Sequence, residues 1–371
     1  MTAIESTLPD WPRAYGEPPV AAVLRAAPAD FFVEEVMGFE PDGRGEHCWL
    51  WVEKENLNTA DAAQRLARFA GLRERDVSYS GLKDKIAVTR QWFCLHLLNR
   101  SPDWQRWDDP ALRLLRIERH SRKLRRGTHR ANRFVIVLRD LRGDIDALSA
   151  RGDLLARNGV PNYFGEQRFG RGGRNLELAL QMKGGARRPP RQQASMYLSA
   201  ARSFVFNEVL AARIARSSWL TPLPGDVFML DGTSSVFAAE PDTEIRDRFA
   251  AGDIHITGPL CGRVGSIAAG GLVDVLEVGI CADQQALVTV VEAGGVEASR
   301  RALRCMPTNL TMEFVDDTAC RIQFELPKGC FATSLVRELA RYELPTPVPQ
   351  DAQTLLESRA DQAAATINSQ E

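Results

Sequence analysis

The chain has 371 residues, with 47 Lys and Arg against 48 Asp and Glu, and a formal net charge of −1 at pH 7. A hydrophobic content of 44% with 26% charged residues is typical of globular proteins, and it excludes a disordered chain, a collagen-like repeat and a small disulfide scaffold. No segment approaches the ~20 apolar residues that span a bilayer, and the start lacks the basic and apolar regions of a signal peptide. At ~150 residues a domain, the length predicts roughly two domains.

The first hundred residues predict a mixture of strands and helices. β-Branched and aromatic residues between turn residues predict strands at 31–33, 49–52, 77–79 and 88–95. Apolar residues at helical spacing predict one helix, with Thr59 as its N-cap and Gly71 at its end. The last two strands are joined by the polar loop 80–85, with the sequence Ser-Gly-Leu-Lys-Asp-Lys.

The middle of the chain begins with the same alternation. Residues 134–138 predict a strand, and residues 145–158 predict a helix that ends at Gly159. The segment 161–173 then holds four Gly and three aromatic residues, which indicates an unusual backbone with rings close by. Apolar positions from 198 to 212 mark one face of a long helix.

Residues 219–300 differ from both flanking parts of the chain. They contain Pro-Gly turns, a hairpin signal at Asp231-Gly232 and Gly-rich loops, and they are less basic. After residue 311 the earlier character returns, with an alternating strand at 322–326 and a helix around 335–339. We therefore expect one α+β domain built from residues 1–187 and 301–345, an inserted domain at 188–300, and a mobile C-terminal tail at 346–371.

Positive charge is concentrated in two places. Residues 113–133 contain nine Lys and Arg and one Glu, and a second cluster comprises Arg187, Arg188 and Arg191. Such basic patches on a nearly neutral chain fit the electrostatic footprint of a nucleic-acid-binding protein. A solvated surface without a partner is the alternative.

Several common catalytic motifs are absent. The Gly-rich segment 165–173 is neither a Walker A loop nor a dinucleotide fingerprint, and the chain has no GxSxG and no HExxH. The seven cysteines are odd in number, with no CxxC and no zinc spacing, so we expect free thiols in a reducing cytoplasm. Any chemistry is therefore expected to rest on side chains alone, without a metal or a cofactor.

The loop 80–85 is the best candidate for chemistry. Asp84 lies there between Lys83 and Lys85, and nearby cations favour a carboxylate that can act as a nucleophile or a base. A charged surface loop without a catalytic role has the same composition, so the residues alone leave both interpretations open.

Longer motifs resemble one known family. GLKDKIAVTRQWF (81–93) and NYFGEQRFGRGGRNL (162–176) are similar to motifs of the TruD family of tRNA pseudouridine synthases. Further similar segments follow in family order: DFFVEE (30–35), FEPDGRGEH (39–47), NT (58–59), LSAARSFVFN (198–207) and LPKGCFATSLVREL (326–339). The similarity runs over roughly residues 20–342.

The resemblance implies both a fold and a reaction. The fold is a pseudouridine-synthase-like α+β catalytic domain with a central, mostly antiparallel mixed sheet, interrupted by a family-specific α+β domain. The reaction isomerises uridine to pseudouridine at position 13 of certain transfer RNAs, without a cofactor or metal.

The resemblance also implies roles for individual residues. Asp84 falls on the position of the essential aspartate, which would attack the sugar or the base or take a proton from C2′. Phe164 would stack on the target uracil, and Asn162 would position the Asp84 loop or the substrate. Arg25 stands where many members carry Lys, which preserves the charge but not the point-like ammonium.

Lys83 and Arg168 complete the expected substrate-binding set. Transfer RNA is the expected partner, with no membrane, and we expect a monomer because no apolar heptad pattern is visible. Two alternatives stay open: a non-catalytic RNA-binding or chaperone protein on the same scaffold, and the same chemistry on another RNA.

Overall fold

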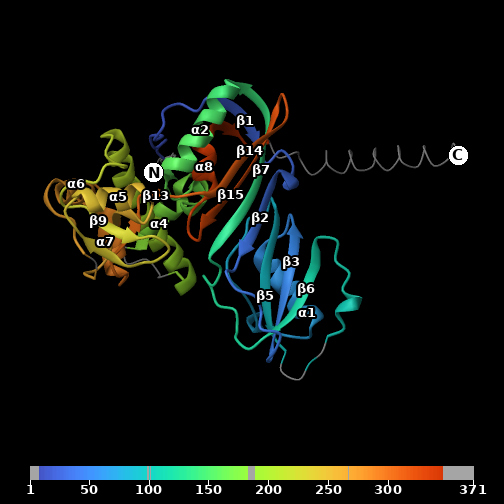
Figure 1. The fold of residues 1–371 in the computed structure, drawn as a ribbon. Helices are drawn as coiled ribbons and strands as arrows, with labels where there is room; N and C mark the ends of the chain where they lie inside the picture. Colours follow the sequence, from blue (N-terminus) through green and yellow to red (C-terminus); the bar gives the residue numbers. More distant parts are fainter. Residues whose placement is uncertain (1–7, 98–99, 101, 183–188, 266, 346–371) are drawn as a thin grey trace, which may run out of the picture.

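A computed structural model describes residues 8–97, 100, 102–182, 189–265 and 267–345 (Figure 1). Its largest element is a ten-stranded mixed sheet in the order β14-β15-β7-β2-β5-β3-β6, with β1 pairing β7 and β16, and β4 pairing β5. These strands are β1 (Val20–Leu24), β2 (Phe31–Val36), β3 (His47–Glu55), β4 (Val77–Tyr79), β5 (Val88–His96), β6 (Leu112–His120), β7 (Ala131–Gly143), β14 (Thr308–Asp316), β15 (Ala319–Pro327) and β16 (Ala340–Glu343).

Most neighbours in this sheet are antiparallel. In the described part of the chain, the parallel pairings are β2 with β5 and β1 with β16. The expected α+β fold with a mostly antiparallel mixed sheet is therefore confirmed. Strands from distant parts of the sequence share the sheet, since β15 pairs with β7 from Cys320 to Pro327.

Two helices cover one face of the sheet at the end where β7 and β15 pair. These are α2 (Ile145–Asn158) and α8 (Ala332–Leu339), seen beside β14 and β15 in Figure 1. The predicted alternation in β15 places Ile322, Phe324 and Leu326 in the core beneath them. α2 begins where the Asp144 carboxylate accepts a hydrogen bond from Ala147 N, and it ends as expected at a glycine with φ +82°.

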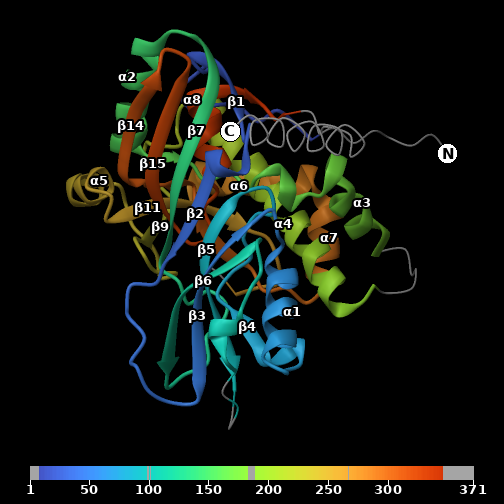
Figure 2. The same ribbon diagram turned by 90° about the vertical axis from the view of Figure 1, so that its right-hand side faces the viewer.

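The other end of the sheet has its own helix, α1 (Thr59–Phe69), which lies beside β3 and β4 in Figure 2. Its apolar face packs with residues of β3, β5 and β6 in a separate core cluster. Asn58 occupies the N-cap position, so the assignment of Thr59 as N-cap was one residue wrong. Thr59 is buried, and its hydroxyl accepts a hydrogen bond from the neighbouring loop rather than capping the helix.

Most of the remaining elements form a second layer at one side of this sheet (green through yellow to orange in Figure 1). They are α3 (Arg174–Gln181), α4 (Arg191–Ala215), β9 (Val227–Leu230), β10 (Val236–Ala238), α5 (Thr243–Ala250), β11 (Ile254–Leu260), α6 (Gly271–Asp283), α7 (Gln285–Ala293) and β12 (Ser299–Ala302). The strands form a four-stranded sheet in the order β10-β9-β11-β12, and β9 and β10 make the expected hairpin. A short ladder of β8 (Val160–Pro161) and β13 (Arg304–Cys305) leads back to the large sheet.

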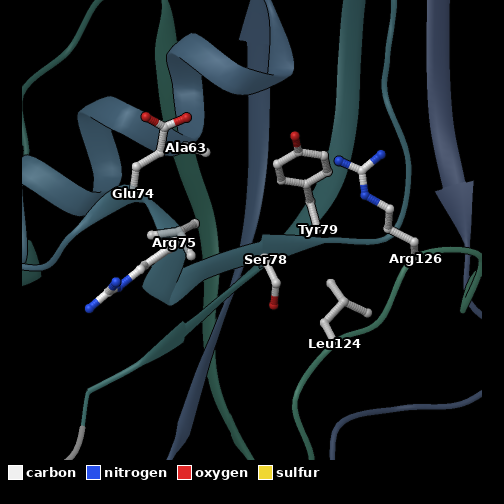
Figure 3. Close-up of a pocket in the computed structure, with 8 residues that line it drawn as sticks. Ala63, Glu74, Arg75, Ser78, Tyr79, Leu124 and Arg126 are labelled. Atoms are coloured by element: carbon white, nitrogen blue, oxygen red, sulfur yellow. The ribbon is translucent and has the colours of Figure 1, made fainter. Parts of the chain in front are cut away.

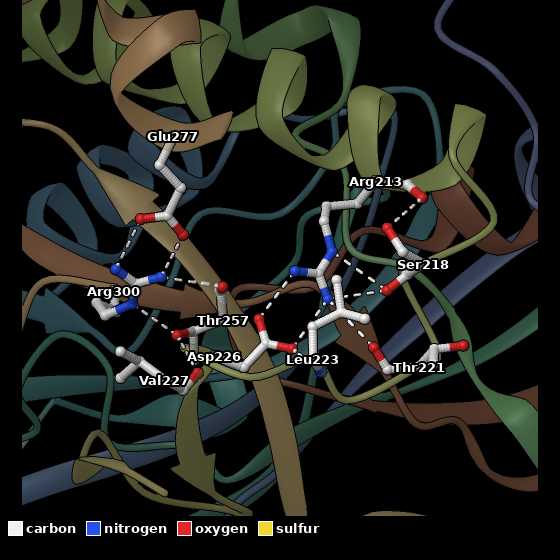
Figure 4. A network of polar contacts seen from close by, with 9 residues as sticks. All are labelled: Arg213, Ser218, Thr221, Leu223, Asp226, Val227, Thr257, Glu277 and Arg300. Carbon is white, nitrogen blue, oxygen red and sulfur yellow. Dashed lines mark hydrogen bonds and ion pairs between the residues drawn. The ribbon is translucent and has the colours of Figure 1, made fainter. Parts of the chain in front are cut away.

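Two arginines inside this second layer form ion pairs with carboxylates (Figure 4). Arg213 Nη1 lies 2.8 Å from Asp226 Oδ1, and Arg300 Nη2 lies 2.5 Å from Glu277 Oε1. Both arginine side chains are only 2% exposed. Each guanidinium also donates to backbone or hydroxyl oxygens, so these buried charges are fully partnered.

The expected domain limits stay a prediction. α3 lies before residue 188 but packs on α4 and α7, and β12 extends two residues beyond residue 300. Arg187, Arg188 and the expected tail at 346–371 lie outside the described residues. Among the described helices, none is both long enough and apolar enough to cross a membrane.

Five short 3-10 turns complete the described structure. They are η1 (Pro28–Asp30), η2 (Glu74–Asp76), η3 (Trp104–Arg106), η4 (Glu166–Arg168) and η5 (Arg171–Gly173). The last two contain the Gly-rich segment, in which Gly170, Gly172 and Gly173 all have positive φ. This is the unusual backbone that four glycines predicted.

Candidate functional site

Asp84 lies in the loop between β4 and β5, which is anchored to the core beneath it. The Thr59 hydroxyl accepts a hydrogen bond from Lys83 N at 2.9 Å and bonds to Gln91 Oε1 at 3.1 Å. Gln91 Nε2 in turn donates to the Gly81 carbonyl at 3.0 Å. Thr59 and Gln91 are both buried, so this polar loop is fixed from below.

The start of the same loop is tied to the segment before β7. Ser80 Oγ lies 2.5 Å from His129 Nδ1 and accepts a hydrogen bond from His129 N at 2.9 Å. Burial, with the nearby charges of Lys83 and Lys328, lowers the pKa of His129 to about 4. The ring is therefore neutral at pH 7 and serves as a hydrogen-bonding anchor.

The Asp84 carboxylate is held by one arginine. Arg25 Nη2 lies 2.6 Å from Asp84 Oδ2, and the Asp84 side chain is 30% exposed. The Arg25 guanidinium lies 4.0 Å from the centre of the Phe31 ring. The backbone of Arg25 has a φ of +63°, a value that residues other than glycine rarely adopt. The carboxylate is thus oriented while part of it stays accessible.

Lys54 supports the loop from the sheet. Its ammonium donates to the Asp84 carbonyl oxygen at 2.9 Å, and its residue is buried in β3. Burial lowers the pKa of Lys54 to about 8, against the opposing effect of the Asp84 charge. Lys54 was not predicted from the sequence, although it lies on the same face of β3 as the apolar residues Leu50 and Val52.

Lys83 is enclosed rather than presented at the surface. Its ammonium lies 2.8 Å from Glu35 Oε1, and the two side chains are 5% and 0% exposed. The other Glu35 oxygen accepts a hydrogen bond from Trp92 N at 3.1 Å. This buried ion pair fastens the loop to β2.

The segment after β8 presents its side chains alternately to two sides. Tyr163 stacks on Trp11, with ring centres 5.9 Å apart, and lies in the core. Phe164 is buried too, at 8% exposed, and meets Phe206 at 5.6 Å and Phe331 at 6.0 Å. The Asn207 side chain exchanges hydrogen bonds with Phe164 N and O, which fixes the backbone of this segment.

Asn162 is buried, and its amide bonds to β12. Its Nδ2 donates to the Ala302 carbonyl at 2.9 Å, and its Oδ1 accepts from Arg301 Nη2 at 2.5 Å. Within the described residues, no hydrogen bond joins Asn162 to the Asp84 loop. The expected positioning role toward that loop is therefore not seen in these contacts.

The segment from Pro327 to Ala332 contacts both groups of candidate residues. On one side, Lys328 Nζ donates to the Gly127 carbonyl, and Gly127 N donates to the Ser80 carbonyl at the start of the Asp84 loop. On the other side, the Gly329 carbonyl accepts from Arg301, and Phe331 packs on Phe164. Ala87 and Ala332 share one core cluster. The Asp84 loop and the Asn162–Phe164 segment therefore flank the same turn.

Two arginines lie against the Phe164 ring. The Arg301 guanidinium carbon lies 4.1 Å and that of Arg168 5.5 Å from the ring centre. Arg168 was expected from the sequence. Arg301 was missed because β12 is short and adjacent arginines carry no periodic signal.

The basic stretch 113–133 divides into two parts. On its strands, Arg113, Arg116 and Arg133 pair with glutamates at 2.7, 3.1 and 2.8 Å. The intervening loop exposes Arg122, Lys123, Arg125, Arg126 and Arg130. This loop is the accessible part of the stretch, and it is the same loop that His129 fastens to Ser80.

A cavity of about 460 Å³ lies beneath this basic loop (Figure 3). Arg126 lies beside Tyr79 at its rim, with the guanidinium carbon 5.4 Å from the ring centre. A second cavity of about 480 Å³ is lined by residues 34–40, Trp51, Trp92 and Arg116. Neither lining includes Asp84, so the candidate carboxylate lies outside both cavities. Within the described residues no group of three or more His, Cys, Asp or Glu could hold a metal ion.

Comparisons with known proteins identify the family of the chain. A family model described as "tRNA pseudouridine synthase D (TruD)" matches residues 13–182 and 174–339. The tRNA pseudouridine synthase D of Methylococcus capsulatus is 44% identical over 339 residues, which is 90% of this chain and 95% of that protein. That of Chromohalobacter salexigens is 45% identical over 338 residues, covering 90% and 97%.

The fold is also similar to a solved structure. The crystal structure from Methanosarcina mazei described as a tRNA pseudouridine synthase D (TruD) has a TM-score of 0.68 to this chain. It covers 91% of this chain and 97% of its own, at 18% sequence identity. At this identity the similarity concerns the fold.

Proposed function

The chain belongs to the TruD family of tRNA pseudouridine synthases, and we propose that it converts uridine to pseudouridine at position 13 of transfer RNA with Asp84 as the catalytic carboxylate. We also propose that the second layer, from α3 to β12, corresponds to the expected domain inserted into a pseudouridine-synthase-like catalytic domain. The observation that carries the proposal is the half-buried Asp84 carboxylate, held by Arg25 on an anchored loop. With transfer RNA as its substrate, the protein is proposed to act in the cytoplasm.

The reaction is an isomerisation and needs no added redox partner. The bond between N1 of uracil and C1′ of the ribose breaks, the base turns, and C5 bonds to C1′. The proton on C5 is lost and N1 gains a proton, so atoms and charge balance. Asp84 attacks C1′ or the base, or removes a proton from C2′; each route uses a carboxylate beside the ribose.

Arg25 and Lys54 keep that carboxylate in place. Arg25 donates to one oxygen of Asp84, which leaves the other for the substrate. Lys54 fixes the backbone at the same residue. We assign Lys83 a positioning role through its pair with Glu35, in place of the direct substrate contact expected from the sequence.

A uridine in folded RNA has to leave its stack before C1′ can be reached, which costs a few kcal/mol. Phe164 offers the extruded base an aromatic contact, and Asn162 holds the segment that carries it. Arg168 and the exposed loop 122–130 supply cations for the neighbouring phosphates. These contacts act together as the substrate-binding surface.

The test is a map of pseudouridine in cellular RNA with and without this gene. We expect a single class of transfer RNA position, position 13, to lose its pseudouridine, and the wild-type gene but not Asp84→Asn to restore it. Loss at sites in another RNA would contradict the tRNA assignment. Restoration by Asp84→Asn would show a non-catalytic role for this carboxylate.

A further inference from the structure

Arg301 connects three parts of the candidate site. From β12, its Nη2 donates to Asn162 Oδ1 at 2.5 Å and to the Gly329 carbonyl at 2.9 Å. Its guanidinium lies 4.1 Å from the Phe164 ring centre and 5.5 Å from that of Phe206. The side chain thus lies between the Asn162–Phe164 segment and the turn at 328–331, which joins β15 to α8.

The hydrogen-bond acceptors of Arg301 among the described residues are uncharged oxygens. The acceptors of Arg301 are amide and carbonyl oxygens, and no carboxylate lies within ion-pair distance of Arg301 or Arg168 among the residues that the structure describes. Arg301 Nη1 has no hydrogen-bond partner among those residues. A neutral donor could satisfy the same acceptors without desolvating a cation.

A second cation lies on the same ring. Arg168 lies 5.5 Å from the Phe164 ring centre and 6.0 Å from that of Phe331. Within the described part of the chain, its guanidinium makes one hydrogen bond, to Ser199 Oγ at 3.3 Å. Burial lowers the pKa of both arginines, and the charge of Arg168 lowers that of Arg301 further. Two half-buried like charges around one ring are stabilised by an anion placed between them.

We propose that Arg301 and Arg168 together bind one phosphate group of the RNA, adjacent to the nucleotide whose base contacts Phe164. The proposal rests on the proposed function for the identity of the polyanion. Arg301 presents its Nη1 edge and Arg168 its guanidinium, and the two donors grip the backbone where the base is turned out. Arg301 is therefore a substrate-binding residue that also positions Asn162.

The experiment combines protein variants with single neutral linkages in the RNA. A synthetic RNA that contains the target uridine and that wild-type protein binds is prepared in a series, with one methylphosphonate replacing one phosphate at each linkage around that uridine. Binding and turnover are measured for wild type, Arg301→Gln, Arg301→Lys and Arg168→Gln. Arg246→Gln, on the exposed side of α5, is the matched control.

We expect one linkage beside the target uridine at which the methylphosphonate weakens wild-type binding by about 10-fold. At this linkage Arg301→Gln and Arg168→Gln should show little further loss, since the charge they contacted is already gone. Each variant should also lower the salt dependence of binding by about 0.7 in log–log slope. Arg246→Gln should behave as wild type.

Equal losses from the methylphosphonate in wild type and in both variants, at every linkage, would overturn the proposal. So would an Arg301→Gln protein with lower kcat, unchanged affinity and an unchanged salt slope, which is the result of a purely positioning role. Arg168→Gln carries the test if Arg301→Gln fails to fold, because Arg168 makes a single long side-chain bond. Wild-type protein that binds the RNA but forms no pseudouridine would contradict the proposed function and leave the linkage data to decide this site.

Discussion

Arg300 and Arg301 are neighbours in β12 but lie in opposite electrostatic settings. Arg300 points into the second layer and forms an ion pair with Glu277, as Arg213 does with Asp226 (Figure 4). Arg301 points to the other side of the strand, toward Phe164, where no described carboxylate meets it. Arg300 therefore contributes to the fold through an ion pair, whereas the charge of Arg301 has no acidic partner among the described residues.

The Arg25–Asp84 pair lies between these two cases. It is an ion pair, but its side chains are 18% and 30% exposed, against 2% and 0% for Arg213 and Asp226. Partial exposure leaves one carboxylate oxygen for the substrate. The same residue types therefore stabilise one region and remain reactive in the other, and the difference is how completely each pair is enclosed.

The largest expected effect is on stability, at the buried Arg213–Asp226 pair. Asp226→Ala leaves Arg213 buried without its partner and should lower the free energy of unfolding by about 3–5 kcal/mol. Urea unfolding measures this loss. The folded fraction should keep its turnover at low temperature; a variant as stable as wild type would show that the enclosed pair does not hold this layer.

The next effect concerns the partly exposed Arg25–Asp84 pair. Arg25→Met removes the donor that orients Asp84 and should lower kcat by roughly 100-fold, with unchanged folding by circular dichroism. Arg25→Lys keeps a charge and should recover part of this loss. Full activity in Arg25→Met would mean that the Arg25–Asp84 pair is structural, like the Arg213–Asp226 pair of the second layer.

A smaller effect is expected at the ring of Phe164, which is 8% exposed. Phe164→Leu keeps apolar volume but removes the ring face, and should lower kcat/KM by about 10-fold, as expected when one base–aromatic contact is lost. The matched control is Phe314→Leu, on the far edge strand β14, where the ring is exposed and away from Asp84. Similar losses in both variants would argue against a base contact at Phe164.

The smallest effect is a pH dependence. The pKa of His129 is about 4 in the folded protein and near 6.5 when unfolded, so only the unfolded chain gains this proton as the pH falls from 6.5 toward 4. Stability from this neutral histidine is therefore present above pH 6.5 and lost on acidification. Between pH 7 and 5.5, wild type should lose about 1 kcal/mol more unfolding free energy than His129→Asn. Parallel pH curves would contradict the buried neutral ring.

Sequence patterns predicted most of the fold because the large sheet alternates regularly. The strand at 322–326, the helix at 145–158 and the hairpin at Asp231-Gly232 all form where expected. The error at Thr59 arose because a capping hydroxyl and a buried hydroxyl look alike in a sequence. Packing decides between them, and the chain alone does not show what lies beneath a loop.

The candidate site was predictable only in part. Motifs gave Asp84, Asn162 and Phe164, but not how each would be held. Lys83 looked like a free cation in its loop and is enclosed by Glu35, 48 positions away in the chain. Arg301 reaches Asn162 across 139 positions, so its role depends on a fold-level contact that no local pattern carries.

The central claim is that the Asp84 carboxylate breaks and remakes the glycosidic bond. Because C5 of uracil loses its hydrogen when it bonds to C1′, release of tritium from transfer RNA labelled at uracil C5 reports the reaction directly. In single turnover with excess enzyme, we expect wild type to release one equivalent per target uridine, and Asp84→Asn, which should still bind the RNA, to release at least about 1000-fold more slowly. Release by Asp84→Asn at the wild-type rate would contradict the account.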